Sequence, residues 1–454
     1  MIVRSRRIVL PDGVRPATIH IQDGTITRIG PYEDWSDIND SYDAGDLVVS
    51  PGIVDTHVHI NEPGRTDWEG FDTATRAAAA GGVTTVVDMP LNSVPATTTA
   101  AALEAKRTAA RGQCHVDVAF WGGVVPGNAA HLDELVEAGV RGFKCFLVPS
   151  GVDEFPAVYE SDLRAALPII AARGVPLLVH AESPGLINPQ SNPKSDIRDP
   201  KYASYLATRP PEAEVEAIRT TVRLAREFGA RVHIVHVASA EAADEVARAK
   251  ADGVAITAET CPHYLTFAAE DVPDGATEFK CAPPIREARH RAALWSALTR
   301  GTLDLVATDH SPAPPALKCP GDFMKAWGGI ASLELSLAAM WSLSRDRSAG
   351  LSGPRGGAES PALHTLARWV SEAPAKLAGL DDRKGRVAAG YDADLVVWDP
   401  DVEWMVDSPR LQQRHKVTPY AGRRLVGRVQ TTFLRGTPVW RDGRLVAAGS
   451  GRLL

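Results

Sequence analysis

Apolar residues in the middle of the chain form short runs that lack strict apolar–polar alternation. Runs of this kind, rich in Val, Ile and Leu, are typical of strands buried on both faces of a parallel sheet. The pattern predicts eight strands, over 52–60, 84–89, 116–125, 141–148, 176–182, 231–238, 255–261 and 303–309.

Amphipathic segments separate most of these runs, and several of them end in glycine, the usual helix stop. The predicted helices include 70–82, 131–139, 160–174, 210–229 and 239–253. Alternating strands and helices of this number predict an α/β fold, a TIM-like (β/α)₈ barrel.

The two ends of the chain show a different sequence pattern, with short β-branched runs and turn glycines that predict short strands. Neither end is large enough to bury a good core alone. We therefore predict a composite β-sandwich domain from residues 1–50 and 386–454, and the barrel domain over 51–385. A Gly/Ser/Pro-rich stretch at 348–361 predicts a loop.

Composition limits the possible partners and the cellular compartment of the protein. The formal net charge is −7 and no basic stripe appears, which argues against nucleic acid as a partner. No stretch approaches the roughly 18 apolar residues of a membrane span, and the first residues carry too short an apolar run for a signal peptide. The five scattered cysteines suit a reducing compartment, so we expect a cytoplasmic protein.

His57 and His59 are the first candidate for chemistry. They lie two residues apart at the end of the first predicted barrel strand, so both imidazoles project from one face. Such a pair is half of a divalent metal site. An HxH triplet also occurs by chance, so the other strand ends decide between these interpretations.

Further polar groups follow the ends of four other strands, where the catalytic groups of a barrel lie. Each has an ordinary alternative: His180 or His236 as a core histidine, and Asp309 as a helix cap. Their convergence on one face favours a metal site. The predicted ligands are His57, His59, Lys144, His180, His236 and Asp309.

Lys144 cannot bind a metal as an ammonium, because it then has no acceptor. A lysine buried among apolar neighbours has a lowered pKa and a nucleophilic amine, which can capture carbon dioxide as a carbamate. The carbamate has two oxygens and can bridge two divalent ions. We therefore predict N6-carboxylysine at 144 and two ions per chain, zinc first, with cobalt, manganese or iron also compatible.

This set of residues, with a sandwich built from both ends, resembles the amidohydrolase superfamily. The resemblance covers nearly the whole chain and is strongest to the cyclic-amide hydrolases, namely allantoinases, dihydroorotases and hydantoinases (dihydropyrimidinases). It rests on PGIVDTHVH, AAAAGGVTTVVDMP, ETCPHYL and ATDHSP.

Finer motifs favour the allantoinases within this group. Dihydroorotases typically carry Arg two residues after the HxH pair, where this chain has Asn61. An amide cannot clamp a carboxylate bidentately, and allantoin has no carboxylate but many amide groups. Asn92 in MPLNSVPATT and the segments NEPGRTDWEGF and FMKAWGGIASLE complete the allantoinase-like pattern.

The resemblance implies hydrolysis of the hydantoin ring amide of allantoin to allantoate, a step of purine (ureide) catabolism. A metal-bridging hydroxide would attack the ring carbonyl, with Asp309 as general base and then general acid. By analogy with related enzymes, the resemblance also implies a homotetramer. A hydantoinase or dihydroorotase is the alternative, and the complete ligand set argues against a non-enzymatic scaffold.

Contacts to the substrate are harder to assign from sequence. Asn61 and Asn92 suit amide recognition, but both residue types also form turns. Cys281 occupies the place where related hydantoinases use a backbone contact, and a catalytic thiol is not needed beside a metal hydroxide. The other candidates are Ser311, Trp327 and Gly328, with His263 and His310 expected behind the ligands.

Overall fold

The barrel consists of eight parallel strand positions in sequence order. The computed structural model describes residues 1–35, 40–187, 200–348 and 359–454. One sheet runs β6 (Ile53–Val58), β7 (Val83–Asp88), β8 (Asp117–Phe120), and a second runs β9 (Gly122–Gly123), β10 (Phe143–Phe146), β11 (Leu177–His180), β12 (Val232–Ile234), β13 (Ile256–Thr260), β14 (Leu305–Val306). Only Trp121 separates β8 from β9, so the two occupy one position. A parallel bridge from Val58 to His310 closes the ring.

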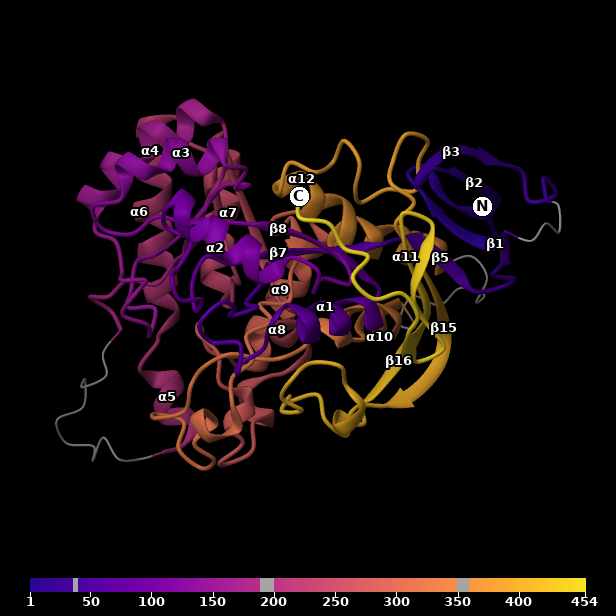
Figure 1. The fold of residues 1–454 in the computed structure, drawn as a ribbon. Helices are drawn as coiled ribbons and strands as arrows, with labels where there is room; N and C mark the ends of the chain where they lie inside the picture. Colours follow the sequence, from indigo (N-terminus) through magenta and orange to yellow (C-terminus); the bar gives the residue numbers. More distant parts are fainter. Residues whose placement is uncertain (36–39, 188–199, 349–358) are drawn as a thin grey trace.

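Helices surround the barrel and the strands from the two chain ends (Figure 1). They are α1 (Phe71–Ala80), α2 (Ala100–Ala110), α3 (Leu132–Glu137), α4 (Glu160–Arg173), α5 (Tyr202–Ala207), α6 (Pro211–Phe228), α7 (Ala240–Ala251), α8 (Pro262–Thr266), α9 (Ala288–Thr299), α10 (Ser336–Ser348), α11 (Glu359–Ala367) and α12 (Ala373–Leu377). Short 3₁₀ turns lie at 129–131, 269–271, 277–279, 315–318, 333–335 and 408–410, and a π-helical turn at 368–372. Thr99 and Ser239 cap α2 and α7 through their hydroxyls, and left-handed Gly174 and Gly229 end α4 and α6.

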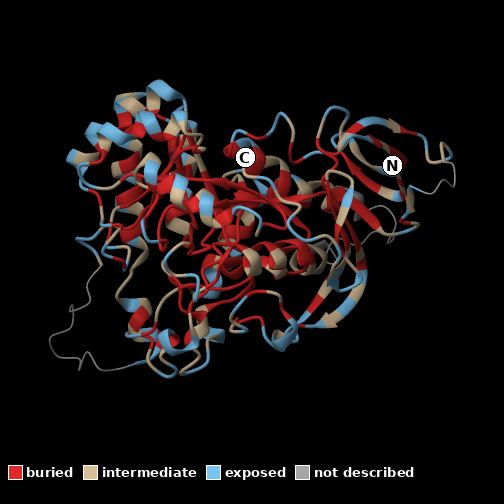
Figure 2. Ribbon diagram, viewed as in Figure 1, coloured by how far each residue is buried: buried red, intermediate tan, exposed pale blue. Residues whose placement is uncertain are grey.

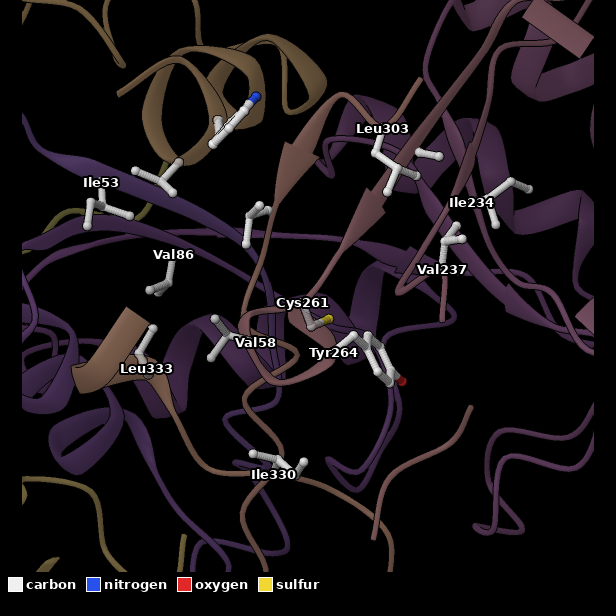
Figure 3. Packing of buried hydrophobic residues seen from close by; sticks show 14 of the residues in the cluster. Ile53, Val58, Val86, Ile234, Val237, Cys261, Tyr264, Leu303, Ile330 and Leu333 are labelled. Carbon is white, nitrogen blue, oxygen red and sulfur yellow. The ribbon is translucent and has the colours of Figure 1, made fainter. Parts of the chain in front are cut away.

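Barrel side chains alternate between two hydrophobic clusters. Val86 and Val179 belong to the larger cluster, which packs against the helices, whereas their neighbours Val87 and Leu178 belong to a smaller one. Figure 3 shows part of the larger cluster, with Val58 and Val86 near Leu333. Figure 2 shows the buried residues concentrated in the strands. Burial on both faces explains why the strand runs lack alternation.

Strands from both chain ends form one nine-stranded sheet. Its order is β18 (Arg444–Leu445), β17 (Thr437–Arg441), β16 (Arg424–Leu434), β15 (Leu395–Met405), β5 (Val48–Pro51), β1 (Ile2–Leu10), β2 (Gly13–Gln22), β3 (Thr25–Gly30), with β4 (Ser41–Asp43) also paired to β1. β5 and β15 join the halves, with Leu395 opposite Pro51 (Figure 1). The sheet has its own apolar cluster, including Val3 and Ile19. The predicted fold class is confirmed, while the exact domain boundaries stay a prediction.

A buried cluster of charges joins this sheet to the barrel. The Lys384 ammonium lies 2.6 Å from Asp117 of β8, 2.5 Å from Asp394 and 2.9 Å from Asp392. Arg435 donates to both oxygens of Asp117. The three carboxylates come close enough together to bind a metal ion, but these two cations and Arg383, which pairs with Asp392, already neutralise them.

The sequence also predicts a loop at 348–361 and no membrane span. Residues 349–358 of the predicted loop lie outside the described residues, and α11 begins at Glu359. Among the helices that are described, none has the length and apolar character needed to cross a membrane.

Candidate active site

The carboxyl ends of the barrel strands open into a cavity of about 430 Å³, a size typical of small-molecule sites. Five of the six predicted metal ligands line it: His57, His59, His180, His236 and Asp309. Lys144 is fully buried on β10 beneath the cavity. The sequence therefore brings these side chains together, as the strand-end argument requires.

Asp309 is the meeting point of the first two histidines. Its Oδ1 lies 3.2 Å from Nε2 of His57 and 3.3 Å from Nε2 of His59. Potential ligand atoms of His57, His236 and Asp309 all lie within 4.8 Å of one another. The ring of His180 packs edge-on against that of His236, with centroids 4.6 Å apart. This geometry identifies a candidate metal-binding group.

Two buried glutamates fix the orientation of the histidines. Nδ1 of His57 lies 2.5 Å from Glu259, whose other oxygen contacts His233 at 3.1 Å. Nε2 of His180 lies 2.7 Å from Glu182. Each glutamate occupies one ring nitrogen, so Nε2 of His57 and Nδ1 of His180 remain for a ligand. Such outer carboxylates are a regular feature of metal-binding histidines.

The unpaired atoms of the site fit a bound cation. Because Nδ1 of His57 contacts Glu259, Nε2 is the ring nitrogen that faces the carboxylate oxygen of Asp309. An imidazole nitrogen and a carboxylate oxygen brought together in this way can coordinate one cation. The buried Nζ of Lys144 and Nδ1 of His236 have no hydrogen-bond partner among the described residues. A buried polar atom without a partner is costly unless a ligand satisfies it.

Electrostatics keep the ligands in the protonation states that metals need. Burial lowers the pKa of His180 and, further, that of His236, so both rings are neutral near pH 7. Burial also lowers the pKa of Lys144 to about 8, which gives a usable fraction of free amine. Burial acts to raise the pKa of Asp309, but His57 and His59 outweigh it and the net shift is downward.

Backbone strain gathers around the same residues. His236 and Asp309 have φ values of 41° and 46°, and Asn61 and Asn92 both have 68°. Non-glycine residues rarely adopt this left-handed region, and they do so most often at functional sites.

The predicted substrate contacts divide into two groups. Asn92, Ser311, Trp327 and Gly328 line the cavity. Gly329 lets this loop approach, since a Cβ there would come within 2.3 Å of the Ser311 carbonyl oxygen.

The other two candidates lie away from the cavity wall. Asn61 donates to the Pro312 carbonyl at 3.4 Å, and the carbonyl of Cys281 accepts a hydrogen bond from Tyr205. Neither residue lines the cavity, so a substrate role for them stays a prediction. Burial raises the pKa of the Cys281 thiol to about 12, which agrees with the absence of a thiol role.

Several site residues escaped the sequence argument. Glu182 and Glu259 end predicted strands as the histidines do, in LLVHAES and ITAETC, and this position was the available signal. Arg209 and Lys280 also line the cavity, but they come from segments outside the strand ends. Only the fold brings these cations to the wall.

Known proteins resemble the chain over its whole length. A family model described as the Amidohydrolase family matches residues 48–439. An allantoinase of Streptomyces avermitilis is 48% identical, covering 100% of this chain and 98% of that protein. An allantoinase of Arabidopsis thaliana is 42% identical, covering 99% and 90%. The solved L-hydantoinase (dihydropyrimidinase) of Arthrobacter aurescens superposes with a TM-score of 0.92 at 33% identity, covering 100% and 98%.

Proposed function

The chain belongs to the amidohydrolase family, and we propose that it hydrolyses the hydantoin ring amide of allantoin to give allantoate. The single observation that carries this proposal is the meeting of His57, His59 and Asp309 at one carboxylate oxygen, in a chain that allantoinases match from end to end. The cavity has room for a small, amide-rich ring.

His57, His59, His180, His236 and Asp309 would hold two divalent ions, zinc or another metal that imidazole and carboxylate accept. When bound, such ions activate a water molecule and polarise the ring carbonyl. The buried amine of Lys144, which has no hydrogen-bond partner among the described residues, supports its reaction with carbon dioxide to a carbamate, whose oxygens would complete the ligand set.

Asp309 acts as the catalytic proton carrier. Its carboxylate is ionised at neutral pH, since the neighbouring histidines hold its pKa down, so it can accept a proton from the attacking water. The same oxygen can then return that proton to the departing ring nitrogen. His57 and His59 keep the carboxylate in place for both steps.

The cavity wall positions the substrate. Asn92, Ser311 and the backbone at Trp327 and Gly328 supply neutral hydrogen-bonding groups for the ring amides.

We also propose a cytoplasmic homotetramer. The tetramer rests on analogy with related enzymes, and the cytoplasm on five cysteines that are all unpaired.

A hydantoinase or dihydropyrimidinase is the second candidate, because the Arthrobacter aurescens structure is so similar. The test is the kcat/KM of purified protein on allantoin, hydantoin, dihydrouracil and dihydroorotate. The proposal expects allantoin to be preferred. A preference for hydantoin or dihydrouracil would favour the second candidate, and a preference for dihydroorotate would refute both.

A further inference from the structure

Arg209 lines the cavity beside the candidate metal ligands with part of its hydrogen-bonding capacity unused. Its Nε donates to one oxygen of Glu182 at 3.0 Å, and its Nη2 donates to the other at 2.5 Å. Nη1 makes no hydrogen bond to the residues that the structure describes. A guanidinium has five N–H donors, so a whole edge of Arg209 remains for a ligand.

The position of this guanidinium is firmly fixed. The Arg209 carbonyl accepts a hydrogen bond from Arg286 at 2.9 Å, and Arg286 is itself paired with buried Glu214 at 2.7 Å. Glu182 is fully buried and also contacts His180, so a single carboxylate separates Arg209 from the candidate metal ligands. A donor held in this way loses little entropy when a ligand binds.

The other cations at the cavity wall are already engaged. Lys280 donates to the carbonyls of Ala326 and Met324, at 2.6 Å and 3.3 Å. Lys325 pairs with Asp322 and is 79% exposed. Arg209 is therefore the charged donor best placed to meet a substrate inside the cavity.

Allantoin differs from hydantoin by a ureido group on the carbon next to the carbonyl under attack. Placing that carbonyl next to Asp309 leaves the ureido group within the cavity, where its carbonyl oxygen needs a donor. We propose that Nη1 of Arg209 donates to the ureido oxygen and so makes the cavity selective for ureido-bearing hydantoins. This inference rests on the proposed function. Arg209 would be a specificity-determining residue, held in place by Glu182.

The test compares kcat/KM on allantoin and on unsubstituted hydantoin in wild type and in Arg209→Lys. Lysine can keep the charge opposite Glu182, but it has no second donor edge to offer the ureido oxygen. We expect the allantoin-to-hydantoin ratio to fall by about tenfold to a hundredfold. Arg435→Lys is the matched control, since it alters a similar, largely buried Arg–carboxylate pair, with Asp117, that does not line the cavity, and its ratio should equal that of wild type.

Metal content distinguishes specificity from an indirect effect. If both activities fall in parallel and bound metal is lost, Arg209 acts through Glu182 and His180, and the proposal is wrong. An unchanged ratio with normal metal content also overturns it. Should Arg209→Lys fail to fold, the neutral double variant Glu182→Gln/Arg209→Gln must show the same fall in ratio. Wild-type protein that turns over hydantoin but not allantoin would instead refute the proposed function.

Discussion

Replacing Lys384 with methionine should destabilise the whole molecule, because this lysine lies between three buried carboxylates. Its side chain is 1% exposed, and its ammonium contacts Asp117, Asp394 and Asp392. Methionine fills a similar volume but leaves one negative charge uncompensated. Breaking a buried ion pair by removing one partner costs about 3–5 kcal/mol. In a chain of this length, that corresponds to a fall in Tm of about 3–5 °C.

The loss should also depend on pH. Burial and Asp117 already raise the pKa of Asp394 against the opposing effect of Lys384, and removing the lysine raises it further. When folding raises the pKa of a carboxyl group, the protein loses stability as pH rises from the unfolded-state pKa to the folded-state pKa. The stability lost in Lys384→Met should therefore be larger at pH 8 than at pH 5.

Thermal unfolding of both proteins at the two pH values measures this effect. Lys250→Met is the control, since Lys250 forms its ion pair with the partly exposed Asp304 and its loss should cost about 1 kcal/mol. A Tm within 1 °C of wild type at pH 8, or an equal loss at both pH values, would refute the argument from buried charge.

Three further substitutions test other parts of the account. Lys144→Ala should lose bound metal and activity, with partial rescue by short-chain carboxylates; wild-type activity in this variant would contradict the bridging role. Glu259→Gln should weaken metal affinity by about tenfold to a hundredfold in a chelator competition, because His57 loses its charged partner, and an unchanged affinity would show that Glu259 does not orient the ring. Burial raises the pKa of Glu334 to about 7, so wild-type stability should fall as pH rises from about 4.5 to 7. Glu334→Gln should remove that slope and gain at most about 3 kcal/mol at pH 8, whereas a slope equal to that of wild type in thermal unfolding would assign it to other groups.

The barrel could be predicted because its strands are short apolar runs that end in polar residues. Each of the eight predicted runs overlaps an observed strand, and the six predicted ligands gather at or beneath the cavity. Strand lengths were less predictable. The run at 231–238 forms a strand only over Val232–Ile234, because His236 takes up a left-handed conformation where the chain leaves the barrel.

Contacts between distant segments were beyond the sequence argument. Lys384 meets Asp117 across 267 positions, and His57 meets Glu259 across 202. No periodicity or spacing in the sequence predicts such pairings, because they form only when the barrel closes and the chain returns to the terminal sheet. Arg209 reaches the cavity for the same reason, from the turn between α5 and α6.

Allantoate formation during metal reconstitution tests the central claim most directly. Protein stripped of metal would receive increasing amounts of a divalent ion with bicarbonate, and bound metal and allantoin turnover would be measured on the same samples. The account predicts that activity rises with bound metal and reaches its plateau at two ions per chain. Full turnover of allantoin without bound metal, or no turnover with two ions bound, would contradict it.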